Sequence, residues 1–432
     1  MQLRKLKEAV RHFGENLHYR QIKMSEKNVV RIPMKWGRIE REILTQNTIP
    51  ELVDTNRLIS WVKECNLADE ALVTKYMNVI RPYHFSRLLF PILPDKDVCR
   101  EAFAVFIEFV IVLYLCDDEL EAKCNLNELE IVCSAYDFLD EKLKQCFPKI
   151  PSVEELRSFL PHVKKERLLA LVVSLIDSVS RVVSPLLKYS VFPQESVFDF
   201  RCRFAHSLGY NLKGVLHEKK MLGGVSENKL LWRRIFEGAP ITFLMYLEIS
   251  SLSVTGSNKH IPIATEMYIL SSLCCMVTND VYSYHRECNE GLKVDNIISL
   301  WLHNKQIASV AEGVSRISRI VNSAVKYMLA KVKSMKSEYP NNFNVQTLTE
   351  FIALSSVGWL YMHDQGVPRY SDSPWRLNLV DIEESDINSW LAEKDPYADG
   401  VIDQFKYSNL DAKKFIDSLC EKTSVSEEQW ND

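Results

Sequence analysis

The chain contains little glycine and no glycine-rich phosphate-binding loop. Glycine accounts for only 13 of the 432 residues, whereas 47% of the residues are hydrophobic, so the chain can bury a large core. Runs that alternate apolar and polar residues, as half-buried strands do, are also missing. Long helical patterns dominate instead, for example residues 168–176 and the apolar positions at helical spacing between Ile307 and Val332. The sequence therefore predicts an all-α fold.

Signals for disulfides, zinc and nucleic acid are missing as well. The eleven cysteines are an odd number, no CxxC pair or histidine cluster occurs, and Cys274-Cys275 fall in an apolar segment. We therefore expect free cysteines that behave as small hydrophobic residues. A net charge of −4 without a basic, aromatic stripe argues against a nucleic-acid partner.

No segment of the sequence predicts stable insertion into a membrane. The longest apolar run, Phe103–Cys116, is too short to span a bilayer and contains Glu108. Residues 1–45 are basic overall but also contain acidic residues, which transit peptides usually lack, and no hydrophobic signal segment occurs. We expect a cytoplasmic protein that is a monomer or a homodimer.

The most informative segment is residues 279–287. Asn279, Ser283 and Glu287 recur at steps of four, and each step advances about 40° beyond a full helical turn, so all three side chains project from one face. Residues 269–277 are apolar or small, which predicts that the helix is buried. Amide, hydroxyl and carboxylate oxygens on such a face suit a hard divalent cation such as Mg²⁺. Arg286 lies about 20° from the same line, and a cation beside a metal site indicates a metal-bound phosphate.

A second acidic cluster follows another apolar run, residues 109–116. Asp117 and Glu121 share a helix face, and Asp118 lies about 100° around the axis from Asp117. Carboxylates at the end of a buried helix are costly unless something neutralises them. The alternative is a solvated helix end, which this cluster alone leaves open. Glu108 lies about 180° from Asp117, so we assign it no role.

Together the two segments resemble the motifs of class I terpene cyclases of the microbial, single-domain type, which also occurs in some animals such as corals. The aspartate-rich motif of that family, DDxx(D/E), is short and weakly specific, and it is matched by Asp117, Asp118 and Glu121. The second motif, NDxxSxx(K/R)E, is strongly specific, and its five positions are matched by Asn279, Asp280, Ser283, Arg286 and Glu287. The order of the motifs and their separation also fit the family.

The resemblance covers roughly residues 45–375 and implies the fold. We expect an all-α class I terpenoid synthase helical bundle with a single catalytic domain at residues 46–382. Residues 1–45 would form an N-terminal extension, and residues 383–432 would form a C-terminal extension that mixes short helices with a frayed end.

The resemblance also assigns residues outside the two motifs. It implies a pyrophosphate-sensing arginine, a linker and an effector at Arg234, Glu237 and Gly238, with Arg233 as the alternative sensor. A helix break after Gly238, at Ala239-Pro240, would free backbone carbonyls that can face a cationic substrate. The alternative is an ordinary helix end. Arg369 and Tyr370, which follow Gly358-Trp359, are similar to the family's late arginine–tyrosine pair, which closes over the diphosphate.

The activity that the resemblance implies is ionisation of a prenyl diphosphate by Mg²⁺ ions, three in the family. The metal ligands would be Asp117 with Asp118 or Glu121 on one helix, and Asn279, Ser283 and Glu287 on the facing helix. Positive or hydrogen-bonding groups would stabilise the departing diphosphate, namely Arg234, Arg286, Arg369 and Tyr370. Aromatic side chains could stabilise the carbocation, and the candidates are Tyr114, Phe236, Phe243 and Trp359, although each would also suit a core. The chain departs from the commonest pattern at Glu121 and Glu237.

The leading hypothesis is thus a Mg²⁺-dependent terpene cyclase. Its long extensions and cysteine-rich helices favour the C20 substrate geranylgeranyl diphosphate, as in coral-type cyclases, over farnesyl diphosphate and a sesquiterpene product. The second hypothesis is a prenyl-chain-elongating synthase, which should carry two aspartate-rich motifs and so fits less well. The third is a non-catalytic helical scaffold, which the complete set of metal and phosphate ligands disfavours.

Overall fold

In the computed structural model of the protein, the described residues are 28–38, 60, 109, 113, 124–145, 158, 170–173, 175, 177, 201–202, 204–205, 207–209, 211–216, 226–237, 261–290, 296–366, 370 and 372–406. Most of them are helical, as the sequence predicted. The helices are α7 (Leu126–Gln145), α11 (Glu227–Glu237), α13 (Ile261–Glu290), α14 (Ile297–His303), α15 (Val310–Glu338), α16 (Phe343–Tyr361), the π-helix η2 (Met362–Gly366), α17 (Ile387–Ala392) and α18 (Pro396–Asp403). The strands are β1 (Val29–Pro33) and β2 (Asn378–Ile382).

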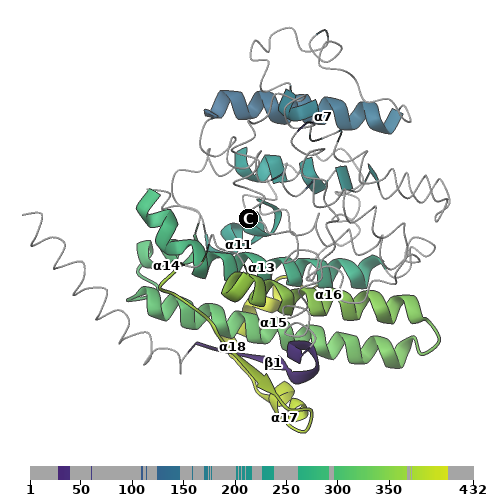
Figure 1. The fold of residues 1–432 in the computed structure, drawn as a ribbon, viewed down its shortest axis with the longest axis vertical. Coiled ribbons are helices and arrows are strands. Elements are labelled where there is room, and N and C mark those ends of the chain that lie inside the picture. Colours follow the sequence, from purple (N-terminus) through teal and green to yellow (C-terminus); the bar gives the residue numbers. More distant parts are fainter. Residues whose placement is uncertain are drawn as a thin grey trace, which may run out of the picture.

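Three long helices form the centre of the described structure. α13 packs against both α15 and α16, and α15 and α16 form a hairpin because only residues 339–342 connect them. Figure 1 shows these helices side by side, with α7 at one end of the long axis and α17 at the other. α11 and α14 both contact α13 near its second half, which carries the polar motif.

The sequence predicted α15 from its apolar spacing alone. The helix begins at Val310, three residues after the expected start, because the Ser309 side chain accepts a hydrogen bond from the Glu312 amide and so caps the first turn. The predicted apolar stripe is completely buried at Val314, Ile317, Ile320, Val321, Val325 and Met328. Periodicity therefore identified the buried face correctly.

The cysteines behave as the sequence predicted. Among the described residues, the free cysteines are Cys124, Cys133, Cys202, Cys274, Cys275 and Cys288. Cys274 is fully buried, and burial raises the pKa of its thiol to about 12, so it stays protonated and packs as a small apolar side chain.

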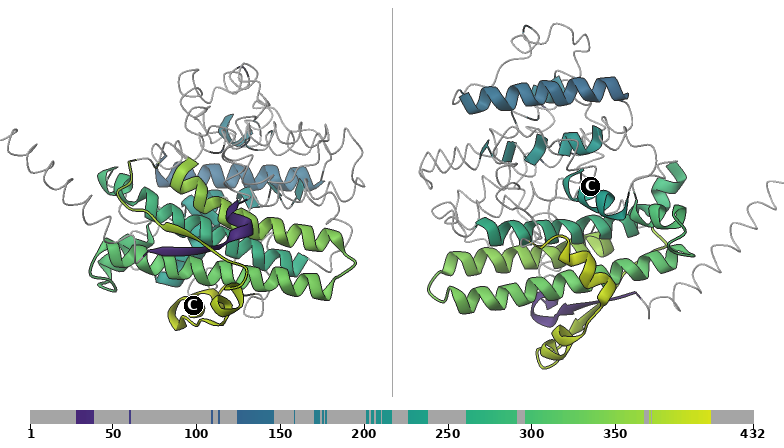
Figure 2. Two further views of the ribbon diagram at one scale, coloured as in Figure 1. Left: turned by 60° about the horizontal axis from the view of Figure 1, so that its bottom comes forward. Right: turned by 180° about the vertical axis from the view of Figure 1, so that it is seen from behind.

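A two-stranded parallel sheet joins distant parts of the chain, and the sequence pattern did not predict it. Val29 pairs with Asn378 and Pro33 with Ile382. Figure 2 shows the pair laid across the central helices. Asn322 of α15 fixes β1 there, because its Oδ1 accepts from the Arg31 amide at 2.8 Å and its Nδ2 donates to the Val29 carbonyl at 2.8 Å. Residues 28–38 of the expected N-terminal extension are therefore packed onto the helical bundle.

Removing the Asn322 side chain should loosen β1. We expect Asn322→Ala to lower the free energy of unfolding by about 2 kcal/mol, because it leaves one backbone donor and one backbone acceptor without their partner. Urea unfolding would measure the change. The matched control is Asn388→Ala on α17. This exposed side chain accepts a long hydrogen bond of 3.4 Å from Lys333 Nζ, and we expect a change below about 0.5 kcal/mol. Equal changes in both variants would contradict the assignment.

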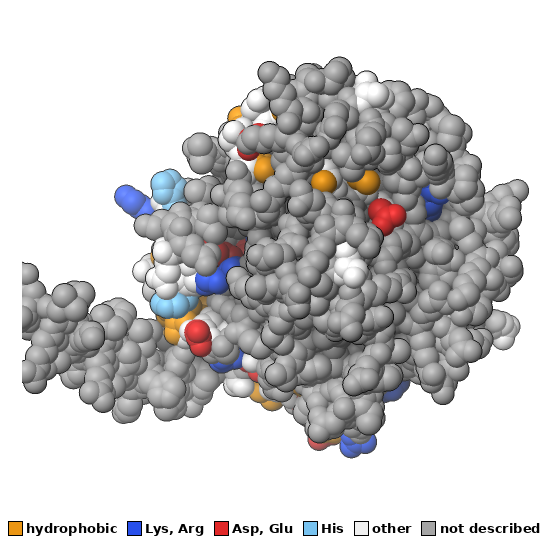
Figure 3. Space-filling view, turned by 45° about the horizontal axis from the view of Figure 1, so that its top comes forward, with side chains coloured by type: hydrophobic (Ala, Val, Ile, Leu, Met, Phe, Trp, Pro, Cys, Tyr) orange, Lys and Arg blue, Asp and Glu red, His pale blue; other side chains and the backbone are white. Residues whose placement is uncertain are grey.

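The described part of the surface is mixed in character. Figure 3 shows apolar, basic and acidic side chains interspersed on one face. Two large apolar side chains among the described residues are exposed, Leu126 at 40% and Val380 at 41%, and single exposed residues of this kind are ordinary. None of the described helices has the length and hydropathy needed to cross a membrane.

Candidate active site

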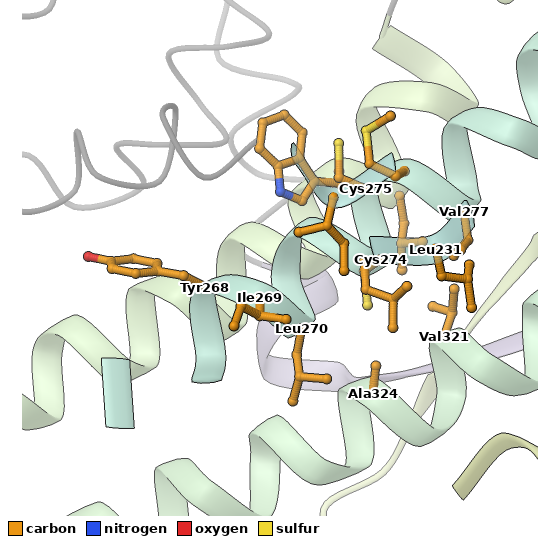
Figure 4. Packing of buried hydrophobic residues seen from close by; sticks show 14 of the residues in the cluster. Leu231, Tyr268, Ile269, Leu270, Cys274, Cys275, Val277, Val321 and Ala324 are labelled. Carbon is orange, nitrogen blue, oxygen red and sulfur yellow. The ribbon is translucent and has the colours of Figure 1, made fainter. Parts of the chain in front are cut away.

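The packing of α13 places its polar second half at a defined position. Cys274 and Val277 of α13 lie among Leu231 of α11 and Val321 and Ala324 of α15, as Figure 4 shows, and all five side chains are buried. This apolar contact fixes the rotation of the helix about its axis. The polar residues that begin at Asn279 on the next turn therefore have a fixed orientation toward α11 and α14.

The three predicted metal ligands of α13 form one row. Ser283 Oγ donates to the Asn279 carbonyl at 2.8 Å and lies 3.4 Å from Asn279 Oδ1. Two oxygens bound side by side to one octahedral Mg²⁺ at about 2.1 Å are about 3 Å apart, so this pair fits that ion. Glu287 continues the row one turn on, with 14% of its side chain exposed. The oxygen donors are those that Mg²⁺ prefers.

The acidic half of the predicted metal site cannot be placed against this row. Asp117, Asp118 and Glu121 lie outside the described residues, as do Tyr114, Phe243, Gly238 and Arg369. Within the described ranges, no group of three or more histidine, cysteine, aspartate or glutamate side chains could hold a metal.

Arg234 reaches the metal-ligand row from α11. Its Nη2 donates to Asp280 Oδ1 at 2.6 Å and to Asn279 Oδ1 at 3.2 Å. Both side chains of the ion pair are largely buried, with exposed fractions of 11% for Arg234 and 1% for Asp280. Arg233, the alternative sensor, is buried at 2% exposure. Of the two arginines, Arg234 is the one in hydrogen-bonding contact with the metal-ligand row.

Asp280 connects α13 to α14 as well as to α11. Its second oxygen accepts from the Ile297 amide at 2.9 Å, at the start of α14. The pKa of Asp280 is raised to about 6, because burial outweighs the opposing Arg234 guanidinium and the nearby Glu287 carboxylate adds to the rise. The cost of burying this carboxylate is thus only partly offset by its partners.

Asn296 orients the last residue of the row, and sequence reasoning missed it. Its Nδ2 donates to Glu287 Oε2 at 3.0 Å and to the Asp280 carbonyl at 2.7 Å, while its Oδ1 caps α14 by accepting from Ile298. An asparagine directly before Ile297-Ile298 is a helix-start signal, so the cap could have been predicted. The contact with Glu287 depends on the tertiary fold.

Tyr370 approaches the same row from beyond α16. Its hydroxyl accepts from Asn279 Nδ2 at 2.7 Å, across 91 residues of sequence. The Tyr370 ring lies 4.9 Å from the His363 ring and 6.4 Å from the Tyr282 ring, measured between centroids. The structure therefore brings one member of the predicted arginine–tyrosine pair to the metal-ligand row.

The π-helix η2 supplies a further side chain, Asp364, that the sequence did not single out. Asp364 accepts from the Tyr282 hydroxyl at 3.0 Å and from Arg376 at 3.3 Å. The same Tyr282 hydroxyl accepts from the Leu377 amide at 3.2 Å. π-Helical turns such as η2 are rare and frequently occur at functional sites.

The remaining predicted residues have varied surroundings. Arg286 lies on the last turns of α13, where its Nη2 is 3.9 Å from Glu287 Oε1 and a third of its side chain is exposed. Trp359 is 1% exposed and belongs to the main hydrophobic core, which is the alternative that the sequence left open. Phe236 and Glu237 end α11, and their side chains are not described. Their proposed roles stay predictions.

His363 should make stability depend on pH. It is buried beside Tyr370, and its Nδ1 donates to the Trp359 carbonyl at 2.7 Å. Burial lowers the pKa of His363 to about 4, so between pH 6.5 and 4 the unfolded chain binds a proton that the folded chain does not. His363 alone should therefore remove about 3 kcal/mol of unfolding free energy on acidification across this window, whereas Asp280, whose pKa is raised to about 6, works in the opposite direction.

Chemical denaturation of the wild type and of His363→Gln at pH 7 and pH 4 would isolate the His363 contribution, because both proteins contain Asp280. We expect His363→Gln, which can still donate to the carbonyl, to lose about 3 kcal/mol less than the wild type on acidification. His303→Gln at an exposed position is the control and should keep the wild-type dependence. A dependence that is unchanged in His363→Gln would contradict the assignment.

A comparison with protein families finds a match that covers this site. The family model described as terpene synthase family 2, C-terminal metal binding, matches residues 194–327, a range that contains Arg234 and the whole row from Asn279 to Glu287. A comparison with curated proteins finds no match.

The chain is similar to several solved structures. The SVS_A2 protein from ancestral sequence reconstruction is 12% identical, with a TM-score of 0.52 over 88% of this chain and 97% of that chain. A variant of cucumene synthase is 11% identical (TM-score 0.49, 80% of this chain and 97% of that chain). Isoprene synthase from leaves of grey poplar (Populus x canescens) is 15% identical (TM-score 0.48, 71% and 52%). At such low identity, the first of these likenesses shows the fold alone.

Proposed function

We propose that this chain, a class I terpene synthase with the metal-binding domain and the all-α fold of that class, ionises a linear prenyl diphosphate and cyclises the carbocation with release of diphosphate. One observation carries the proposal. Three oxygen donors for a metal (Asn279, Ser283 and Glu287) lie in one row, and a guanidinium and a phenol from distant segments, Arg234 and Tyr370, meet that row at Asn279. This combination suits an anion held through a metal.

Each residue has a definite task in this proposal. Asn279, Ser283 and Glu287 would hold Mg²⁺, and Asp117 with Asp118 or Glu121 would complete a site for three ions. Bound Mg²⁺ supplies positive charge that stabilises the departing diphosphate. Asn296 would hold the Glu287 carboxylate in position through its 3.0 Å hydrogen bond.

The hydrogen-bond donors would recognise the diphosphate itself. Arg234, Arg286, Arg369 and Tyr370 would donate to its oxygens, which gain charge as the carbon–oxygen bond breaks. Arg234 now donates to Asp280 and Asn279, so diphosphate oxygens would compete with these two acceptors for the guanidinium.

The carbon skeleton would react in a pocket without water. Breaking the carbon–oxygen bond leaves both bonding electrons on the diphosphate and an allyl cation on the prenyl chain of the substrate. Ring closure moves the positive charge, and loss of a proton ends the reaction as a hydrocarbon, whereas capture of water ends it as an alcohol. The aromatic faces proposed to stabilise the cation are Tyr114, Phe236, Phe243 and Trp359. Each would contribute up to about 2 kcal/mol if it faces the cation in a desolvated site.

The substrate that we propose is geranylgeranyl diphosphate, with a diterpene product. Incubating the purified protein with Mg²⁺ and, separately, the C10, C15 and C20 diphosphates, followed by gas chromatography–mass spectrometry, tests this. A cyclic product from the C20 substrate supports the proposal in full. A cyclic product from farnesyl diphosphate instead would correct the chain length. If adding isopentenyl diphosphate yields a longer prenyl diphosphate, the activity is chain elongation and not cyclisation. No product from a folded protein would reject the activity.

A further inference from the structure

Residues 395–405, from the expected C-terminal extension, contact α11 directly. The Tyr397 hydroxyl donates to Glu227 Oε1 at 2.9 Å, and Glu227 lies in the first turn of α11. The Phe405 ring lies 4.7 Å from the Trp232 ring of the same helix, and Phe405 is completely buried. Two separate contacts therefore join this segment to the helix that carries Arg234.

Tyr397 itself is held rigidly by α15. The guanidinium groups of Arg316 and Arg319 lie over its ring at 5.5 Å and 5.3 Å from the centroid. Arg319 also forms two hydrogen bonds of 2.6 Å with Asp395, which caps α18 through the Ala398 amide. A bidentate pair of this kind fixes both orientation and position. The Tyr397 hydroxyl is therefore a fixed point at which α11 can be held.

Glu227 and Arg234 lie on the same side of α11. Seven residues separate them, so they differ by about 20° around the axis and by about 10 Å along it. α11 has only 11 residues, and a rotation about its axis moves both side chains together. A guanidinium about 6 Å from the axis moves about 1 Å when the helix turns by 10°. A displacement of that size disturbs a hydrogen bond of 2.6 Å.

We propose that Tyr397 and Glu227 form a clamp that sets the rotation of α11 and so positions Arg234 for the diphosphate. Tyr397 is then a positioning residue for the reaction, acting through Arg234 without touching the substrate. The inference rests on the proposed function, in which Arg234 contacts the diphosphate.

Binding of inorganic pyrophosphate with Mg²⁺, measured by isothermal titration calorimetry, tests the clamp without requiring turnover. We expect Tyr397→Phe and Glu227→Ala each to weaken binding about threefold to tenfold, the effect of one lost hydrogen bond. Glu227→Gln keeps an acceptor for the Tyr397 hydroxyl and should stay within about twofold of the wild type. In steady-state kinetics, Tyr397→Phe should lower kcat more than it raises KM, because Arg234 would stabilise charge that develops as the carbon–oxygen bond breaks.

Two comparisons separate positioning from a general loss of stability. The matched control is Tyr327→Phe. It removes the hydroxyl of a tyrosine on α15 that, like Tyr397 on α18, donates to a glutamate, in this case Glu266 of α13. It should leave pyrophosphate binding unchanged. In an Arg234→Gln background, where an amide can still donate to Asp280, adding Tyr397→Phe should weaken binding no further.

The outcomes distinguish the clamp from the proposed function. An equal loss in Tyr327→Phe, an additive loss in the Arg234→Gln background, or full binding by Tyr397→Phe would each overturn the clamp while the function stands. Wild-type protein that is folded and binds no pyrophosphate with Mg²⁺ would overturn the function, and the clamp with it.

Discussion

Asn279→Ala and Glu287→Ala are each expected to lower turnover of the prenyl diphosphate by about a thousandfold, while the protein stays folded. Each substitution removes one oxygen from the row on α13. The two side chains differ in their other contacts, because Asn279 also donates to Tyr370 whereas Glu287 accepts from Asn296. A similar loss in both variants would therefore identify their shared role as metal ligands. Product formation followed by gas chromatography–mass spectrometry, with thermal unfolding for the folded state, gives the measurement.

Asn289→Ala is the matched control on the same helix. Asn289 is exposed, ten residues after Asn279, and it contacts the ring of His285. We expect nearly unchanged turnover in this variant, since surface substitutions of this kind rarely matter. Wild-type product formation by Asn279→Ala or Glu287→Ala would reject the metal site on α13.

The parts of the site that could be predicted from the sequence are those that one helix determines. A step of four residues places Asn279, Ser283 and Glu287 on one face whatever surrounds the helix. Helical spacing likewise identified the buried stripe of α15. These predictions need no knowledge of tertiary contacts, and the structure confirms the helices and the proximity of the Asn279 and Ser283 side chains.

The proximity of Tyr370 and Arg234 to Asn279 was predicted only through the resemblance to a family. Nothing local to an arginine–tyrosine pair indicates that its hydroxyl will lie 2.7 Å from an amide 91 residues earlier. The same holds for the contact between Asn296 and Glu287. Helix-capping rules predict that the Asn296 carbonyl oxygen accepts from its own helix. They do not predict which side chain accepts a hydrogen bond from the Asn296 amide nitrogen.

The sequence pattern did not predict the pairing of β1 with β2 either, because this pairing also depends on a contact between distant segments. Each strand has only five residues, and their register joins Val29 to Asn378. Segments of this length carry a weak strand signal, and the partner of a parallel strand can lie anywhere in the chain. The contact of Tyr397 with Glu227, 170 residues apart, is equally non-local.

The second large effect should come from Asp280, the buried carboxylate that joins three helices. At pH 8, where this carboxylate is ionised, we expect Asp280→Ala to lower the free energy of unfolding by about 3–5 kcal/mol. The substitution leaves the Arg234 guanidinium, whose side chain is 11% exposed, without the carboxylate 2.6 Å away. It also removes the acceptor of the Ile297 amide at the start of α14. Urea unfolding at pH 8 would measure the loss.

Two further variants identify the unpaired charge as the cause of that loss. Asp280→Leu combined with Arg234→Met removes both charges and should recover a large part of the stability, because a buried ion pair can often be replaced by packed apolar side chains at little cost. Asp137→Ala is the exposed control. Asp137 pairs with Lys213 at 3.0 Å, but 51% and 37% of these two side chains are exposed, so the change should stay below about 1 kcal/mol. A double variant no more stable than Asp280→Ala would mean that the hydrogen bond to Ile297, and not the ion pair with Arg234, dominates the role of Asp280.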